Sequence, residues 1–153
     1  MPFMKTTLSL IGASLLWSAC SVAGPLGGRA EAAGQPFVMQ PGEDLRVSGT
    51  GLRLSFIGVV RDSRCPRGEQ CVSAGSAVVR LAWQVGDAAR VVREATVGDG
   101  RPDPVPLIAG GQMIELLDLQ PQPVSGRPID AAQYRLTMKV QAAVVADPAA
   151  AQR

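Results

Sequence analysis

The sequence predicts an all-β protein, a single antiparallel β-sandwich of about six to eight strands behind a signal peptide and a flexible tether. Short apolar runs alternate with polar residues at a period of two, and Gly, Pro and Asp separate these runs. No long apolar period of 3.6 residues occurs outside the N-terminal segment, which argues against an α/β or helical fold. At 153 residues the chain has room for one domain with a substantial core.

Residues 1–19 have the pattern of a bacterial lipoprotein signal peptide. Lys5 provides a positive charge near the start, and residues 8–17 form an apolar run that is too short to span a membrane. The small residues before Cys20 resemble a lipobox, so Cys20 is predicted to carry a lipid. The alternative is an ordinary secretory signal that is cleaved after Ala23. Lipidation is favoured because it leaves an even pair from the three cysteines.

Changes in composition set the remaining boundaries. Residues 20–35 are rich in Gly and Ala without an apolar period, and they are predicted to form a flexible tether. The sandwich domain is expected over residues 36–146, followed by a frayed tail at 147–153. The protein is therefore expected to be exported. If lipidated, it would attach to the membrane through its N-terminal lipid, on the periplasmic face of the outer membrane, because Ser21 is not an aspartate retention signal. Without the lipid it would be periplasmic or secreted.

The first half of the domain is expected to supply several short strands. Residues 37–39 and 45–47 are short candidates, and Gly-containing turns separate them from a longer strand at residues 52–60. In that longer strand, alternate residues from Leu52 to Phe56 share one face before the apolar parity shifts. The shift predicts a β-bulge near Gly58.

The second half contains the two clearest strand patterns. Residues 77–85 and 134–140 each keep one apolar parity throughout, so Trp83 and Leu136 are expected to be buried. Three further assignments complete the domain. Residues 90–97 are the expected hairpin partner of 77–85 near a sheet edge, 98–111 are mostly loop, and 113–119 form another strand. One helical turn is expected at residues 130–132.

Cys65 and Cys71 bound a short charged loop on which the domain is centred. In an oxidising envelope the expected state of two cysteines six residues apart is a disulfide, worth roughly 2 kcal/mol for so short a loop. A redox pair or a thiolate metal site is the alternative. The spacing is not C-x-x-C, and a zinc site without histidine would need carboxylates such as Asp62 or Glu69. No metal site and no cofactor is therefore predicted.

Charged residues crowd the same loop. Arg61, Arg64 and Arg67 lie near Asp62 in the sequence and would form an anion-binding concavity if their guanidinium groups converge. The alternative is a set of local ion pairs, with Asp62 accepting backbone N–H groups inside the turn. If the arginines only decorate the loop, replacing Arg64 and Arg67 by alanine is expected to cost little stability.

The run Asp62-Ser63-Arg64-Cys65-Pro66, followed by Cys71-Val72 and Ala74-Gly75, resembles a set of small exported bacterial proteins, often lipoproteins. The resemblance covers residues 37–140, although only this motif is specific. Those proteins often carry an aromatic residue at the positions of Ser73 and Gln122, so any role of that aromatic does not transfer to this chain. The group has no established activity, and the resemblance implies a fold and a compartment without a chemistry.

Composition narrows the functional classes. Fifteen Lys and Arg against thirteen Asp and Glu is too even a balance for a nucleic-acid partner. The absence of histidine disfavours an enzyme. The leading hypothesis is a non-enzymatic accessory or binding module that presents loops to an envelope protein. The alternatives are a binder of a small ligand or anion and, with less support, a thiol redox or metal-binding protein. A concave pocket lined by Trp83, Tyr134 and convergent arginines would favour the small-ligand binder.

Overall fold

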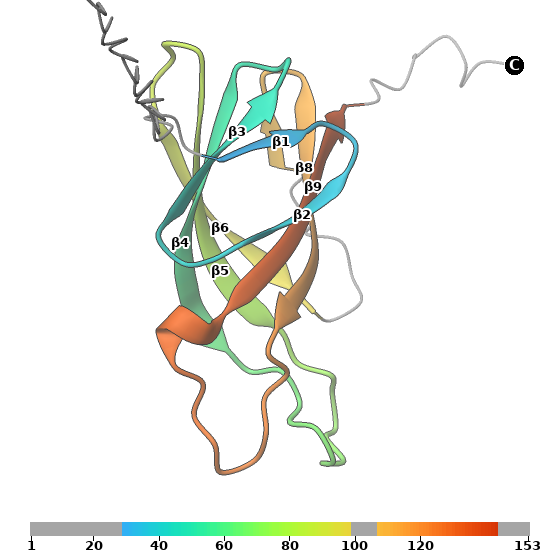
Figure 1. Cartoon of the computed structure of the whole chain (residues 1–153). Helices are drawn as coiled ribbons and strands as arrows, with labels where there is room; N and C mark the ends of the chain where they lie inside the picture. The colour runs from blue at the N-terminus through green and yellow to red at the C-terminus, as the bar shows by residue number, and fades with distance from the viewer. Residues whose placement is uncertain (1–28, 99–106, 144–153) are drawn as a thin grey trace, which may run out of the picture.

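The structure, a computed structural model, describes residues 29–98 and 107–143, which form an all-β domain (Figure 1). Within these ranges nine strands lie in two sheets, one of five strands and one of four, that pack as a sandwich. Every neighbouring pair is antiparallel except β1 with β3. The predicted fold class is confirmed, with one strand more than the expected range.

The five-stranded sheet has the order β1-β3-β4-β5-β6. Its strands are β1 (Arg29–Ala32), β3 (Glu43–Ser48), β4 (Leu52–Asp62), β5 (Ala77–Val85) and β6 (Val91–Val97). As predicted, β6 is the hairpin partner of β5 and lies at an edge of the sheet. The register shifts between Phe56 and Gly58, so the predicted bulge in β4 is also confirmed.

The four-stranded sheet has the order β2-β9-β8-β7. Its strands are β2 (Pro36–Met39), β9 (Arg135–Ala142), β8 (Gln112–Gln120) and β7 (Leu107–Ala109). The single 3₁₀ turn η1 (Ala131–Gln133) precedes β9, and the Asp130 side chain caps it by accepting a hydrogen bond from the Ala132 backbone N–H. The helical turn expected in this connection is therefore present.

The core lies between the two sheets and follows the predicted period of two. Trp83 is 8% exposed and Leu136 is fully buried, so both strands on which the prediction depended point the expected side chains inward. Both sheets contribute to one continuous apolar cluster. Its largest fully buried members are Phe56, Met39, Leu45, Leu52, Leu54, Leu81, Leu119, Leu136 and Met138.

One boundary prediction was wrong. Arg29–Ala32 falls in the expected tether but forms β1, which pairs in parallel with β3. The segment lacks an apolar pattern, and backbone pairing with β3 and the contact of the Arg29 guanidinium with Glu43 at 3.1 Å connect it to the sheet. Within residues 98–111, which were expected to be mostly loop, Leu107–Ala109 forms the short edge strand β7. The predicted signal (1–19), Cys20 and the tail (147–153) lie outside the described residues.

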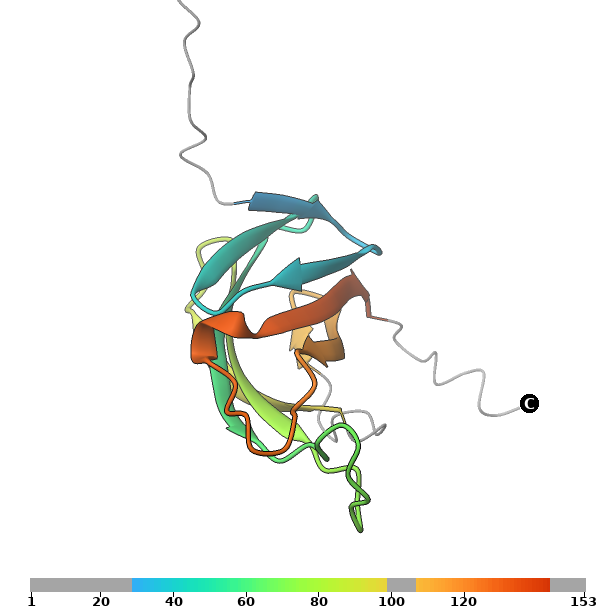
Figure 2. The same ribbon diagram turned by 60° about the horizontal axis from the view of Figure 1, so that its bottom comes forward.

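Two long connections project from the same end of the sandwich. One joins β4 to β5 and the other joins β8 to η1, and Figures 1 and 2 both place them at the end opposite β1. The described ranges contain no helix with the length and hydropathy of a transmembrane span.

Candidate functional site

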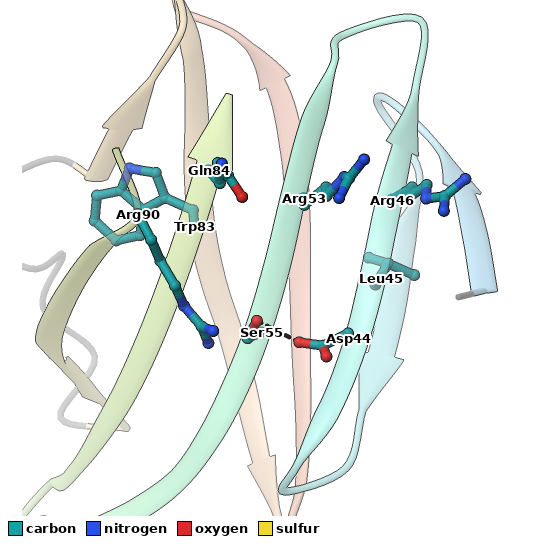
Figure 3. A pocket seen from close by; sticks show the side chains of 8 residues that line it. All are labelled: Asp44, Leu45, Arg46, Arg53, Ser55, Trp83, Gln84 and Arg90. Atoms are coloured by element: carbon teal, nitrogen blue, oxygen red, sulfur yellow. Dashed lines mark hydrogen bonds between the residues drawn. The ribbon is translucent and has the colours of Figure 1, made fainter. Parts of the chain in front are cut away.

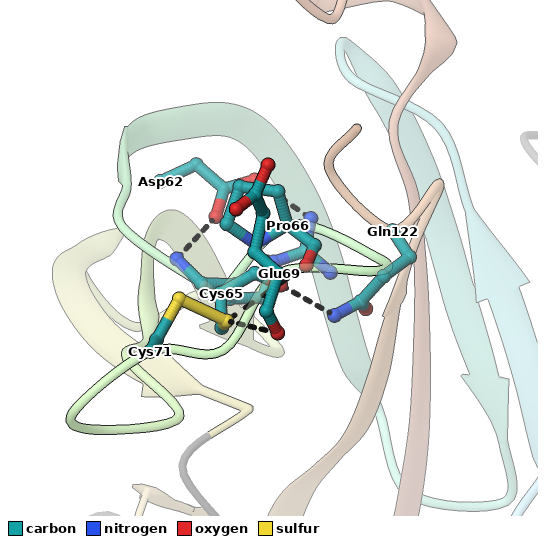
Figure 4. Close-up of a disulfide and its surroundings, with 7 residues drawn as sticks. Asp62, Cys65, Pro66, Glu69, Cys71 and Gln122 are labelled. Carbon is teal, nitrogen blue, oxygen red and sulfur yellow. Dashed lines mark hydrogen bonds and ion pairs between the residues drawn. A yellow bond between two sulfur atoms is a disulfide. The ribbon is translucent and has the colours of Figure 1, made fainter. Parts of the chain in front are cut away.

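The first of these connections is the cysteine loop, residues 63–76. Two backbone hydrogen bonds extend the β4–β5 hairpin into it, from Ser63 N–H to Ser76 O (2.9 Å) and from Cys65 N–H to Ala74 O (2.8 Å). Beyond them a disulfide joins Cys65 to Cys71, whose Cα atoms are 5.9 Å apart (Figure 4). The predicted disulfide is confirmed, and it closes the tip of the loop.

Only glycine fits at position 75, where the cysteine loop rejoins the hairpin. Its φ of +65° lies in the left-handed region, which side chains other than glycine rarely adopt. A Cβ atom placed there would lie 1.9 Å from the carbonyl oxygen of Ser63. The backbones of the two loop stems therefore approach each other as closely as they do only because this residue has no side chain.

A buried ion pair lies beneath the loop. The Arg64 side chain is 4% exposed and that of Asp62 is 10% exposed. Arg64 donates to the carboxylate twice, from Nε to Oδ1 (2.9 Å) and from Nη2 to Oδ2 (2.7 Å). Asp62 also accepts from the Arg64 backbone N–H (3.1 Å) and from the Tyr134 hydroxyl (3.2 Å). This bidentate geometry is the strong form of an Arg–carboxylate pair.

These contacts shift two pKa values in opposite directions. Burial by itself disfavours the Asp62 carboxylate, but hydrogen bonds and charge from Arg64 outweigh that cost and hold the pKa of Asp62 below its ordinary value. Burial and then the neighbouring Asp62 charge raise the pKa of Tyr134. The lowered pKa favours the ionised Asp62 carboxylate, which accepts, and the raised pKa favours the neutral Tyr134 hydroxyl, which donates. Both shifts agree with the hydrogen bond from Tyr134 to Asp62.

Arg64 also ties the cysteine loop to the second connection, the proline loop (residues 121–130). Its Nη1 donates to Leu119 O, and its Nη2 donates to Pro121 O at 2.9 Å. Two further hydrogen bonds cross between the loops, from Arg67 N–H to Pro123 O (2.8 Å) and from Gln122 Nε2 to Cys65 O (3.3 Å). We refer to these two loops together as the loop pair. It is cross-linked at several points and forms one surface.

The structure describes all four residues considered for an anion site in this loop, Arg61, Asp62, Arg64 and Arg67. Arg64 and Asp62 are buried and bound to each other and to the backbone, so neither is available to an external ligand. Of the interpretations considered, the structural role of Asp62 in the turn is the one observed. Arg61 and Arg67 are exposed. The expectation that alanine at position 64 would cost little stability assumed that Arg64 only decorates the loop, and this assumption is wrong because Arg64 is buried.

Within residues 29–98 and 107–143, no three His, Cys, Asp or Glu side chains gather in a metal-binding group. Both sulfur atoms are already used in the disulfide, whereas a zinc site would require thiolates.

A second candidate site lies on the outer face of the five-stranded sheet, and sequence reasoning missed it. A concave pocket of about 230 Å³ is bordered by side chains from β3, β4, β5 and the β5–β6 turn (Figure 3). The lining residues are Asp44, Leu45, Arg46, Arg53, Ser55, Trp83, Gln84 and Arg90. Three arginines border this pocket, whereas the Trp83 side chain is buried in the core at 8% exposure and Tyr134 does not line the pocket. Because its residues come from three strands, only the strand register reveals that they are neighbours.

Comparisons with known proteins place the chain in no family. No family model, no curated protein and no solved structure matches it.

Proposed function

We propose that this protein is a non-enzymatic binding module of the bacterial cell envelope, anchored by a lipid on Cys20, that presents the loop pair to another envelope protein. The observation that carries the proposal is the cross-linking of two loops into one surface by Arg64, the disulfide and the hydrogen bonds between the loops. Loops held in one conformation lose little conformational entropy on binding, which favours recognition. A purely connective loop would not need a buried ion pair at its base.

The chemistry of the loop pair supports a protein partner with a mixed surface. Val72 is fully exposed, with a relative exposure of 110%, and Val124 is 42% exposed. Arg67 and Arg127 are exposed and make no ion pair within the described residues. A partner that complements this surface would present apolar side chains next to carboxylates.

The position of β1 relative to the loop pair also supports this role. β1 begins at the end of the sandwich opposite the loop pair (Figure 2). A lipid attached upstream of β1 would leave the loop pair on the side away from the attachment and accessible to other proteins.

The test of this proposal uses site-specific cross-linking in intact cells. A photoreactive residue at Val72 or Val124 is expected to trap one discrete protein, and a Val72→Asp change is expected to remove that product when the probe is at Val124. Val92, which is 54% exposed on β6, is the matched control position, and a probe there should trap nothing comparable. Equal labelling at Val92 and Val124 would contradict the proposal.

The anchor is tested separately by intact-mass measurement of the exported protein. A mature N-terminus at Cys20 with a lipid mass increment is expected, and Cys20→Ser should abolish both. A mature protein that begins at Gly24 without lipid would contradict the anchor and leave the loop surface to be judged by the cross-linking alone.

A further inference from the structure

The outer face of the five-stranded sheet carries an unusual arrangement of positive charges. Arg46 on β3 lies directly opposite Arg53 on β4 in the strand register. Like charges directly opposite each other on a sheet are destabilising. Arg90, from the turn between β5 and β6, approaches the same pocket from the other side (Figure 3). This side of the sheet therefore holds three guanidinium groups around one depression.

Two other arginines of the same sheet, one on β5 and one on β1, are neutralised by carboxylates. Arg80 pairs with Glu94 across β5 and β6 at 2.7 Å, and Arg29 pairs with Glu31 and Glu43. In contrast, the side chains of the three pocket arginines make no ion pair or hydrogen bond within the part of the chain that the structure describes. Arg61 on β4 and Arg93 on β6 also make no ion pair within the described residues. The pocket arginines differ from these two in that they border one depression together, each with unused donors.

The one carboxylate of the pocket does not complete the charge balance. Asp44 lies opposite Ser55 and accepts a hydrogen bond from its hydroxyl (Figure 3). Three guanidinium groups against one carboxylate leave an excess of two positive charges around the pocket. A phosphate monoester carries about −1.5 to −2 at neutral pH and offers oxygen atoms in the geometry that guanidinium groups bind bidentately.

The remaining lining residues suit the organic part of such a ligand. Gln84 lies beside Arg53 in the register and provides an amide that can both donate and accept. Leu45 and Trp83 border the pocket. Their side chains belong to the core, at 1% and 8% exposure, and they therefore form the floor of the sheet beneath the pocket. A pocket of about 230 Å³ accepts a small group rather than a polymer.

We propose that this outer-face pocket, formed by Arg46, Arg53 and Arg90, binds a small phosphate monoester. Such a group occurs on soluble sugar phosphates and on lipid headgroups, and both share the chemistry that the pocket recognises. The site lies near the start of β4, whereas the loop pair follows its end, so the two sites can be disabled independently.

Binding is tested by isothermal titration of the exported protein in uncharged detergent micelles. Glucose 1-phosphate is expected to bind and glucose is not, and affinity should fall as salt is raised. Arg53→Ala and Arg46→Ala are each expected to weaken binding about tenfold or more, since a hydrogen bond to a charged group contributes about 1.5–3 kcal/mol. Arg127→Ala, which removes an exposed charge from the proline loop, should change the affinity less than about twofold.

Thermal unfolding distinguishes an Arg53 that binds the ligand from an Arg53 that only stabilises the fold. In phosphate-free buffer Arg53→Ala is expected to unfold at the same or a higher temperature than wild type, because the like-charge pair is removed. Added glucose 1-phosphate should raise the melting temperature of wild type and Arg127→Ala but not that of Arg53→Ala.

The lipid source is distinguished by adding phosphatidic acid or phosphatidylcholine to the micelles. If phosphatidic acid competes with glucose 1-phosphate and phosphatidylcholine does not, the pocket also accepts the lipid headgroup, whereas no competition restricts it to soluble esters. If glucose 1-phosphate does not bind at millimolar concentration, or binds equally to wild type and to the Arg46→Ala/Arg53→Ala double variant, the proposal is overturned. Neither result would affect the cross-linking test of the loop pair.

Discussion

Replacing Arg64 by alanine is expected to destabilise the domain severely. The change removes two hydrogen bonds to Asp62 and those to the carbonyl groups of Leu119 and Pro121. The Asp62 side chain, 10% exposed, would keep only the Tyr134 hydroxyl and one backbone N–H as donors. In the Arg64→Ala variant the Asp62 carboxylate would therefore stay buried without its counter-charge, and this uncompensated buried charge is what destabilises the domain.

The expected loss is about 3–5 kcal/mol in the free energy of unfolding, the range for removing one partner of a buried pair. Since the free energy of unfolding of a whole domain is about 5–15 kcal/mol, Arg64→Ala is expected to be only marginally folded. Arg67→Ala is the matched control. Arg67 is exposed in the same loop and makes no side-chain interaction within the described residues, so its loss should cost less than about 0.5 kcal/mol.

Urea denaturation of the exported protein measures both changes. Fluorescence reports on the core, because Trp83 is the sole tryptophan that follows residue 20. The Asp62→Asn/Arg64→Met double variant keeps the measurement possible if Arg64→Ala does not fold. Removing both charges is expected to cost less than the sum of Asp62→Asn and Arg64→Met measured singly. Equal, small losses for Arg64→Ala and Arg67→Ala would refute the buried-pair argument, and so would strict additivity in the double variant.

Three further outcomes are expected from the same region. Cys65→Ser with Cys71→Ser should lower the free energy of unfolding by about 2 kcal/mol and leave the β-sheet circular dichroism intact; complete unfolding would show that the disulfide is essential to the fold. Because folding lowers the pKa of Asp62, the carboxylate adds to the free energy of unfolding at any pH above 3.8, its ordinary pKa. This stabilisation is lost as the pH falls through the lower pKa of the folded state. The difference in melting temperature between wild type and Asp62→Asn should therefore narrow as the pH is lowered below 3.8, and a constant difference would contradict this. Gly75→Ala should be clearly more destabilising than Gly68→Ala in urea denaturation, because only the first methyl group meets backbone atoms, at 1.9 Å, whereas the second has open space.

The strands were predictable because their signal is local. Each strand of the sandwich has one buried face, so the period of two in residues 77–85 and 134–140 directly reflects burial. The bulge at Gly58 was predictable for the same reason, as the apolar parity changes on either side of it. β1 was not predictable in this way. Residues 29–32 have no apolar face, and their position depends on ion pairs to Glu43 and on pairing with β3.

The role of Arg64 was missed because burial of an arginine depends on distant groups. Its ion-pair partner is two residues away, which suggested a local pair on a solvated loop. The acceptors that allow its burial, Leu119 O and Pro121 O, lie 55 and 57 residues further along the chain. Tyr134, which supports Asp62, is 72 residues from it. None of these contacts leaves a pattern in the sequence around residue 64.

The two candidate sites show why the unused donors of an arginine, rather than its presence in a charged cluster, indicate ligand binding. Arg64 uses Nε and both terminal nitrogens within the protein, so it can stabilise the loop pair but has little left to offer a ligand. Arg46 and Arg53 face each other without a carboxylate, and an anion placed between them would relieve their repulsion while gaining charged hydrogen bonds. The loss of Arg64 should therefore impair the loop surface through stability and leave phosphate binding unchanged in protein that remains folded. The loss of Arg53 should do the reverse, impairing phosphate binding without affecting the loop surface.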